Sequence, residues 1–188
     1  MARLIYSAIT SLDGYVVDAD GNFDWAAPDE EVHAYVNDQE RAVGTYLYGR
    51  RMYEVMVAWE SMDDDAPVMR DYAQVWRGAD KVVYSSTLDE VRGPRTRLEP
   101  AFDPDAVRRL VDESTTDLSI GGPTLAASAL RAGLVDELNV YLNPVVVGGG
   151  TAWLPDDLRL DLTLVAEHRF AGGVVHLRYT PTASDMTR

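Results

Sequence analysis

The sequence predicts an α/β domain, with a mostly parallel sheet, helices on both faces and antiparallel strands at the C-terminal edge. Apolar runs typical of buried strands alternate with segments of helical periodicity up to about residue 133. Beyond that point strand-like runs follow one another, which favours antiparallel pairing at an edge of the sheet. The 188 residues are enough for one compact core, and no repeat or linker divides them. We expect one domain over residues 1–180 and a frayed tail over residues 181–188.

Strands and helices alternate through the N-terminal half. Residues 3–9 predict a first strand, followed by a turn-rich loop through Asp13-Gly14. A helix is expected from Pro28, because the next three residues are acidic and complement the helix dipole, and Gly44 is expected to end it. The other expected elements are a strand over residues 45–48, a short helix through Met56, a helix over residues 67–77 and a strand over residues 81–84.

The C-terminal half begins in the same pattern and then changes. Asp103 is an N-cap residue followed by proline at the first helical position, which predicts a helix. A strand over residues 118–120 leads into a helix that begins at Pro123 and stops at Gly133. The last expected elements are a long β-rich run over residues 135–147 and two strands, 162–170 and 174–179, joined by Ala171-Gly172-Gly173 as a hairpin.

The composition restricts the class of function. The formal net charge is −14, from 31 acidic and 17 basic residues, and such a surface repels nucleic acid and anionic lipid. The absence of cysteine excludes disulfides, thiolate nucleophiles, iron–sulfur clusters and cysteine-ligated zinc. No apolar run approaches the ~20 residues of a membrane helix, and the N-terminus lacks the features of a signal peptide. We expect a cytoplasmic protein with no nucleic-acid or membrane partner.

Two glycine-marked turns, Gly49-Arg50-Arg51 and Ile120-Gly121-Gly122-Pro123-Thr124, indicate phosphate binding. Each follows a short strand and opens a helix. A helix N-terminus presents unpaired N–H groups, and glycine lets a phosphate approach the backbone. Ser85-Ser86 ends a third strand with hydroxyls suited to a ribose or phosphate. Each turn alone also fits a plain strand-to-helix connection, but ligands of α/β sheets bind at this edge, so together they favour a dinucleotide.

Other chemistries have less support in the sequence. There is no G-x-S-x-G elbow of a serine hydrolase, and the glycine spacing differs from the G-x-G-x-x-G fingerprint. His33, His168 and His176 have no companion at metal-ligand spacing. Histidines of this kind are more often solvated or in the core than catalytic. We therefore predict no metal site and assign no catalytic role to a histidine.

Read in chain order, the turns and further motifs resemble the dihydrofolate reductase-like fold, and more closely the reductase domain of bifunctional riboflavin-biosynthesis proteins. The resemblance spans roughly residues 2–180 and implies a single-domain three-layer sandwich that uses NADPH. The motifs that carry it are Ser11-Leu12-Asp13-Gly14, Leu47-Tyr48-Gly49-Arg50-Arg51-Met52-Tyr53-Glu54, Val83-Tyr84-Ser85-Ser86, Ile120-Gly121-Gly122-Pro123-Thr124-Leu125, Leu134-Val135-Asp136-Glu137-Leu138 and Pro144-Val145-Val146-Val147-Gly148-Gly149-Gly150.

The resemblance also implies a set of cofactor contacts. Met52 stands where folate-type members carry threonine, so one hydroxyl near the cofactor is missing. The implied contacts are Gly49, Arg50 and Arg51 with the adenosine-side phosphates, including the 2′-phosphate; Ser85 and Ser86 with the adenosine end; Ile120, Gly121, Gly122, Thr124 and Leu125 with the pyrophosphate; and Ala8, Ile9 and Gly14 with the nicotinamide.

Two carboxylates compete for the catalytic role. In the folate-type pattern, a tryptophan and a proline precede a helix whose first turn carries the pterin-binding carboxylate. Trp25-Ala26-Ala27-Pro28-Asp29-Glu30 resembles this pattern and places Glu30 at that position. Asp13, in the riboflavin-type Ser-Leu-Asp-Gly motif, is the alternative. Glu30 also fits an acid that the helix dipole favours in a first turn, and Asp13 also fits an ordinary turn residue. Asp24, Trp25 and Tyr53 are the expected substrate contacts.

The substrate itself is less well defined. Riboflavin-type enzymes bind a ribose phosphate, yet residues 11–29 contain no Lys or Arg, and the zinc-deaminase motifs H-x-E and C-x-x-C are absent. The leading hypothesis is a stand-alone NADPH-dependent reductase of a small pterin- or aminopyrimidine-like molecule. The alternatives are a nucleotide-binding or sensing module without turnover, and a purely structural domain. The apolar, glycine-rich residues 145–153, at the late strands that form the dimer interface in riboflavin-type relatives, predict a homodimer.

Overall fold

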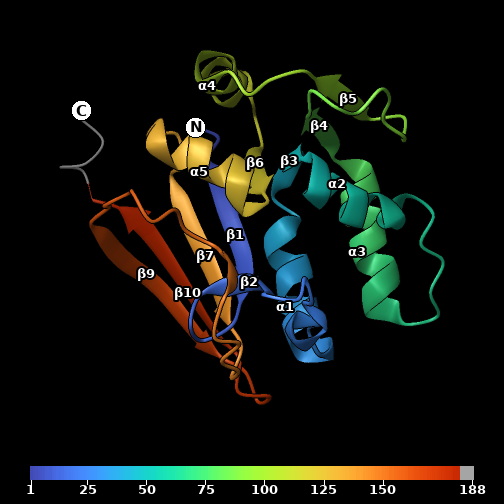
Figure 1. Cartoon of the computed structure of the whole chain (residues 1–188). Coiled ribbons are helices and arrows are strands. Elements are labelled where there is room, and N and C mark those ends of the chain that lie inside the picture. Colours follow the sequence, from blue (N-terminus) through green and yellow to red (C-terminus); the bar gives the residue numbers. More distant parts are fainter. Residues whose placement is uncertain (183–188) are drawn as a thin grey trace.

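The computed structural model describes residues 1–182 and contains an eight-stranded sheet flanked by helices (Figure 1). The strand order is β5-β4-β3-β6-β1-β7-β10-β9. The first six strands run parallel, and β10 pairs antiparallel with both β7 and β9. The predicted α/β fold, with a mostly parallel sheet and antiparallel C-terminal strands, is confirmed.

The elements have the following bounds. The strands are β1 (Leu4–Thr10), β2 (Tyr15–Asp18), β3 (Val43–Gly49), β4 (Asp80–Tyr84), β5 (Thr96–Glu99), β6 (Asp117–Gly121), β7 (Glu137–Leu142), β8 (Gly150–Ala152), β9 (Leu162–Arg169) and β10 (Val175–Pro181). The helices are η1 (Asp24–Ala26), α1 (Glu30–Glu40), α2 (Arg50–Met56), η2 (Val57–Glu60), α3 (Pro67–Gly78), α4 (Pro104–Glu113) and α5 (Pro123–Arg131). A separate two-stranded sheet is formed by β2 and β8.

Helices pack against both faces of the main sheet through apolar side chains. The fold therefore has three layers, with the sheet in the middle. Successive residues of a strand point to opposite faces. On β3, Leu47 packs with residues of α4 and α5, whereas Tyr46 and Tyr48 pack with residues of α3. On the α3 face, α1 covers the other end of the sheet, where Val32 packs against Tyr141 of β7. Figure 1 shows α1 and α3 on one side of the sheet and α4 and α5 on the other.

Two helix starts follow the predicted capping chemistry. Asp103 caps α4 by accepting a hydrogen bond from Asp105 N, and Pro104 is the first helical residue. Asp29 caps α1 in the same way through Val32 N, so the helix begins at Glu30 rather than at Pro28. The extended backbone of an N-cap residue explains why the helix starts after Asp29.

Gly44 does not end α1, contrary to the prediction. The helix ends at Glu40, and Gly44 lies inside β3. A Cβ atom on Gly44 would lie 2.0 Å from Thr116 Oγ1 and 2.8 Å from Thr116 Cβ. Glycine is therefore needed because β3 passes close to the segment that leads into β6. That requirement comes from a residue 72 positions away in the chain, and no local pattern reveals it.

Several short elements differ from the predicted ones. The run predicted as one strand over residues 135–147 is β7 alone, and it ends at Leu142. The strands β2, β5 and β8 were not predicted, because each has only three or four residues and is defined by its pairing partner. The predicted tail is in part ordered, since β10 includes Pro181 and Thr182 N donates to Asp161 O. Residues 183–188 lie outside the described residues.

Replacing Gly44 by alanine tests this packing. We expect Gly44→Ala to lower the free energy of unfolding by about 1–3 kcal/mol, as overpacking does, because the new methyl group overlaps Thr116. Gly78→Ala is the control, since no atom lies within 4 Å of a Cβ there. Urea unfolding measures both. Adding Thr116→Gly to Gly44→Ala should restore most of the loss; an unchanged stability of Gly44→Ala would contradict the assignment.

Candidate functional site

The predicted cofactor residues meet at one edge of the sheet, where the parallel strands have their carboxyl ends. Gly49 of β3 pairs with Tyr84 of β4, so the turn after β3 lies beside Ser85. On the other side, Tyr48 pairs with Gly121 of β6. β1 is the next strand after β6, and its residues Ala8 and Ile9 lie beyond the Tyr6–Ile120 pair toward the same edge. The expected convergence of these turns is therefore present.

The two glycine turns touch each other. A Cβ on Gly121 would lie 2.9 Å from the ring of Tyr48, and one on Gly122 would lie 3.2 Å from Met52 Cβ. Gly122 also has a φ of +92°, a backbone conformation that favours glycine. Beyond it, α5 begins at Pro123, and the first-turn amides of Thr124 and Leu125 have no partner within the helix. The turn thus offers the first-turn N–H donors of α5, while Tyr48 and Met52 pack against the two glycines that precede the helix.

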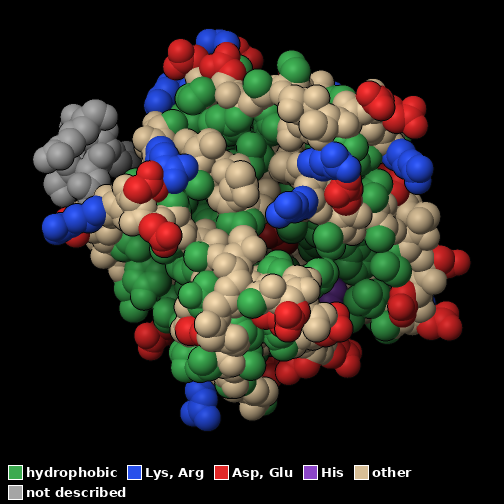
Figure 2. Space-filling model, in the orientation of Figure 1, with side chains coloured by type: hydrophobic (Ala, Val, Ile, Leu, Met, Phe, Trp, Pro, Cys, Tyr) green, Lys and Arg blue, Asp and Glu red, His purple; other side chains and the backbone are tan. Residues whose placement is uncertain are grey.

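Arg50 and Arg51 supply positive charge beside these turns. Both side chains are exposed, and Figure 2 shows basic side chains gathered over α2. Arg50 Nε pairs with Glu54 at 2.7 Å, and its NH1 donates to Thr87 Oγ1 at 3.0 Å. Arg51 forms no ion pair or hydrogen bond with the described part of the chain. An anion at this edge would therefore meet the Arg51 guanidinium, which has no partner in the described chain, and the Arg50 guanidinium, which is bonded to the exposed Glu54 and Thr87.

The serine turn after β4 differs from the expectation in detail. The Ser85 hydroxyl accepts hydrogen bonds from Thr87 N and Leu88 N, and Ser85 N donates to Glu99 O. Ser85 thus holds the turn together, while Ser86 is exposed. Thr87 was not among the predicted site residues, although its hydroxyl contacts Arg50. The Ser-Ser-Thr run was the signal that pointed to it.

Asp13 closes the loop after β1. Its carboxylate accepts hydrogen bonds from Val147 N at 3.1 Å and Gly148 N at 2.8 Å. The Ser11 hydroxyl and these amides hold the pKa of the Asp13 carboxyl below its usual value. The loop turns at Gly14, whose φ is +86° and whose carbonyl accepts from Trp153 N. Asp13 therefore stays ionised and joins the loop after β1 to the segment that precedes β8.

The predicted substrate residues differ in how they are held. Glu30 is exposed in the first turn of α1, and Asp24 is exposed in η1. Trp25 is half-buried, and its Nε1–H is shielded without a hydrogen-bond partner among the described residues. Tyr53 is buried, and its hydroxyl both donates to Arg92 O and accepts from Arg92 N. Tyr53 thus anchors the loop at Arg92, and the substrate-side roles of all four residues stay predictions.

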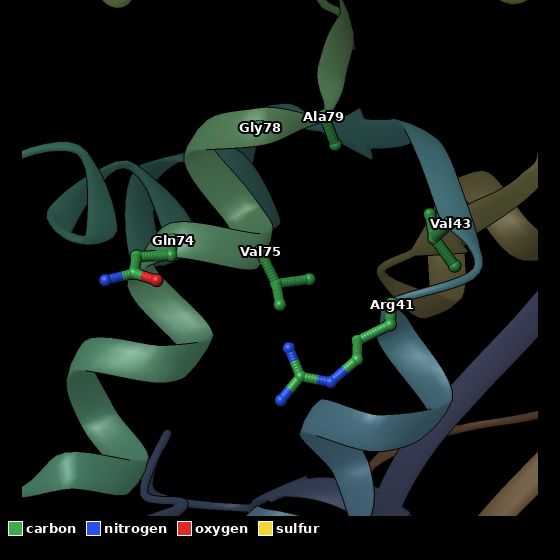
Figure 3. A pocket seen from close by; sticks show the side chains of 6 residues that line it. All are labelled: Arg41, Val43, Gln74, Val75, Gly78 and Ala79. Carbon is green, nitrogen blue, oxygen red and sulfur yellow. The ribbon is translucent and has the colours of Figure 1, made fainter.

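A surface hollow lies away from this edge. It has a volume of about 390 Å³ and is lined by Arg41, Val43, Gln74, Val75, Gly78 and Ala79 (Figure 3). These residues stand where α1 and α3 end and where β3 and β4 begin, so the hollow is at the amino ends of the strands. Arg41 NH2 is bound by both carboxylate oxygens of Asp71. None of the predicted site residues lines this hollow.

Aromatic residues pack near a buried carboxyl group at the C-terminal end of α1. Glu40, the last residue of α1, has its Oε2 atom fully shielded and without a hydrogen-bond partner in the described chain. Burial raises the pKa of Glu40 to about 7, and the neighbouring Tyr46 hydroxyl opposes that rise. Tyr72 lies in the same group of rings, and burial raises its pKa above the usual value. Glu40 is therefore largely protonated below neutral pH.

Metal and membrane sites have no candidate in the structure. In residues 1–182, no three His, Asp or Glu side chains are arranged to hold a metal ion. Within the same range, no helix has the length and apolar character needed to span a bilayer.

The sheet order and the turns at its carboxyl edge define a domain of the dihydrofolate reductase-like class. The dihydrofolate reductase of Enterococcus faecalis, complexed with NADP(H) and RAB-propyl, has this fold, with a TM-score of 0.62 over 96% of each chain at 14% identity. A putative riboflavin biosynthesis protein from Shewanella sp. PV-4 is also similar, with a TM-score of 0.74 and 21% identity over 96% of this chain and 99% of that one.

The sequence comparison narrows the class to a family. The model of the RibD C-terminal domain matches residues 2–176, so the chain belongs to the RibD C-terminal domain family. The uncharacterized protein YyaP of Bacillus subtilis (strain 168) is 26% identical over 179 residues, 94% of each chain. The resemblance to the riboflavin-type reductase domain is confirmed, and the family is one of oxidoreductases.

Neutralising Glu40 tests the buried carboxyl. A pKa raised from 4.5 to about 7 means that Glu40 stabilises the fold below pH 4.5 and that this contribution is lost as pH rises to 7. The loss amounts to up to about 3 kcal/mol. We therefore expect Glu40→Gln to be more stable than the parent at pH 8 and similar to it at pH 4.5, in urea unfolding.

His176 must be separated from this effect. It is buried, and burial lowers its pKa to about 4, so its contribution to stability rises with pH between about 4 and 6.5. Because both proteins contain His176, its contribution cancels in the difference in stability between Glu40→Gln and the parent. A difference that does not change between pH 4.5 and pH 8 would contradict the raised pKa of Glu40.

Proposed function

We propose that the protein is an NADPH-dependent reductase of a small planar heterocycle, of the pterin or aminopyrimidine class. The supporting observation is that three turns and two arginines lie along one sheet edge, in the order in which an extended dinucleotide would meet them. Family membership supports a riboflavin-type reductase. A solved structure of the same fold is a complex with NADP(H).

The residues of this edge fit the cofactor. The first-turn amides of α5, which follow Gly121 and Gly122, suit a pyrophosphate. Arg51 and Arg50 suit the 2′-phosphate, and Ser86 the adenosine end. Ala8, Ile9 and Gly14 would then border the nicotinamide. The bound cofactor supplies the hydride, and the protein's task is to hold the acceptor carbon beside it, to exclude water and to deliver a proton.

Glu30 suits the proton-delivery role better than Asp13. A general acid must hold a proton near neutral pH or exchange one through water. Asp13 is fixed as a carboxylate by amide donors, and its pKa is lowered. Glu30 is exposed and has no hydrogen-bond partner in the described chain, so its carboxyl group is available to a substrate or to a bridging water. We assign the substrate-side carboxylate role to Glu30 and a loop-closing role to Asp13.

The substrate is proposed to lack a phosphate. Residues 11–29 carry no Lys or Arg, and their exposed charges are acidic. A sugar phosphate in this loop would meet no cation.

A nucleotide-sensing module without turnover is the second candidate. The observation that favours it is that Asp13, one of the two predicted catalytic carboxylates, has an evident structural role. Steady oxidation of NADPH in the presence of a reducible pterin or aminopyrimidine separates the two candidates. Saturable NADPH binding with no such oxidation for any of these compounds would favour the sensing module.

We also propose a homodimer. Val146, before β8, is exposed, as are Leu164 and Val165 on the edge strand β9. Leu164 and Val165 lie where the pairing of β9 with β10 shifts register, so Val165 has no partner residue on β10. Exposed apolar side chains on an unpaired edge strand are a liability in a monomer, and pairing with a second copy would cover them.

Removing both arginines tests the cofactor assignment. Arg50→Ala/Arg51→Ala should weaken NADPH binding at least about tenfold, as expected for a lost charge-assisted contact, and weaken NADH binding far less. Fluorescence titration measures both affinities. Arg131→Ala is the matched control, because this guanidinium pairs with Asp157 at the opposite end of α5. Equal losses for the two cofactors would contradict a 2′-phosphate site at these arginines.

Sedimentation tests the dimer. The chain has a mass of 20.8 kDa, and we expect twice that mass at micromolar concentration. Val146→Lys/Val165→Lys should shift the protein to the monomer, because a charge placed in an apolar contact is costly. Val55→Lys, on the exposed surface of α2, is the control. A parent protein that sediments at 20.8 kDa would refute the proposal.

A further inference from the structure

His33 lies near the end of α1 that is closest to the candidate site. α1 connects the parallel strands β1 and β3, and its last residue precedes β3 by three positions. Its first turns therefore lie toward the carboxyl ends of the strands, where the cofactor residues meet. Glu30 precedes His33 by three residues, so the two side chains share one face of the helix.

A hydrogen-bond chain fixes the ring of His33. Its Nδ1 lies 3.0 Å from Asn37 Oδ1. The Asn37 amide nitrogen donates to Val68 O at 2.9 Å and to Asp71 Oδ2 at 2.8 Å. Both of these partners are acceptors, so Asn37 must turn its oxygen to His33, and Nδ1 must carry the hydrogen. Neutral His33 therefore has its lone pair on Nε2.

The other end of this chain is anchored as well. Asn37 is 1% exposed, and Asp71 is bound by Arg41 NH2 at 2.8 and 2.9 Å. The Asn37 amide and Arg41 hold the pKa of Asp71 below its usual value, so the carboxylate stays ionised. Three side chains, Asn37 of α1, Arg41 at its C-cap and Asp71 of α3, thus orient one imidazole. Such an outer chain is the common way to fix the tautomer of a functional histidine.

Two aromatic rings contact the imidazole of His33. Trp59 of η2 and Tyr72 of α3 meet it edge-on, with ring centroids 6.1 and 5.7 Å away. His33 is only half-buried, and Nε2 has no hydrogen-bond partner within residues 1–182. The result is one fixed polar atom beside two aromatic rings.

We propose that His33 binds the substrate, with Nε2 accepting a hydrogen bond from a ring N–H of a planar heterocycle. This inference rests on the proposed reductase function and names the group that selects the substrate. Aromatic neighbours suit a flat ring, and a fixed acceptor rejects an analogue that lacks the matching N–H, because the acceptor is then left unpaired. Asn37, Asp71 and Arg41 act as positioning residues. Glu30, on the same helix face, would meet a second polar group of the ring.

The tautomer gives a test that needs no ligand. Two-bond proton–nitrogen NMR spectra of the ¹⁵N-labelled protein distinguish the two nitrogens of each histidine, and the His33 signals are those missing in His33→Asn. We expect the neutral ring to be protonated on Nδ1, whereas free histidine favours Nε2. A neutral His33 protonated on Nε2 would overturn the proposal.

Binding is tested with 5-aminouracil, a planar pyrimidine with ring N–H groups, and with its 1,3-dimethyl derivative, which has none. We expect 5-aminouracil to shift the Nε2 signal saturably and the dimethyl compound to leave it in place. His33→Asn keeps a donor for Asn37 but nothing at the Nε2 position, so it should bind 5-aminouracil about tenfold more weakly. His33→Gln places an amide near that position and should bind within about threefold of the parent.

The outcome separates this inference from the cofactor proposal. NADPH affinity is measured independently by fluorescence and should be the same in His33→Asn. A shift of Nε2 by 5-aminouracil without NADPH binding would leave the His33 assignment standing and remove the reductase proposal. An unmoved Nε2 signal, or equal 5-aminouracil affinity in the parent and His33→Asn, would overturn the His33 assignment.

Discussion

The candidate site depends on the direct contact between two chain turns, the one that leaves β3 and the one that leaves β6. Tyr48 and Met52 fill the space where Gly121 and Gly122 would carry Cβ atoms. Any larger side chain there would push α2 away from α5, because interiors are close-packed and transmit such changes. The packing holds the start of α5 at the carboxyl edge of the sheet, where its first-turn N–H groups have no partner within the helix. Packing and the proposed anion binding therefore both require glycine at these two positions.

The charge of the protein gives Arg50 and Arg51 special importance in the proposed NADPH site. With a net charge of −14, the surface as a whole repels an anionic cofactor. Over distances beyond the Debye length of about 8 Å this repulsion is screened, so the local charge determines binding. The ion pair of Arg50 with Glu54 joins two exposed side chains and is worth about 1 kcal/mol or less. A bidentate phosphate contact is stronger, so the pair can yield to a bound phosphate.

The sequence predicted that the sheet is mostly parallel, because strand and helix periodicities alternate along the chain. It also predicted that the glycine turns meet, because the carboxyl ends of parallel strands lie at the same edge of a sheet. It failed where the cause was a distant residue. Gly44 was misinterpreted because Thr116 is far away in the chain, and β5 exists only through its pairing with β4. Ser85 was correctly placed at the edge, but its hydroxyl is used by its own turn.

The substrate side shows the same limit more strongly. Asp13 in a Ser-Leu-Asp-Gly motif and Glu30 in a helix start have equal standing as carboxylates in the sequence. Only the structure distinguishes them, because it shows the backbone amides of residues 147–148 donating hydrogen bonds to the Asp13 carboxylate. His33 was set aside because the sequence offers no metal companion at a suitable spacing. Of its chain of partners, only Asn37, one helical turn away, was visible locally; Asp71 and Tyr72 come from α3.

The two halves of the site therefore have different physical origins. The cofactor half is made of strand ends and turns, whose backbone groups are positioned by sheet pairing, so many sequences can build it. The proposed substrate half relies on Glu30 and His33 of α1, and His33 is held by a polar chain that runs to α3. Such a chain is costly unless every member is paired, and Asn37 and Asp71 are fully engaged here. A surface histidine with no ligand would not need such a network. The network therefore supports the proposal that α1 carries the selectivity for substrate.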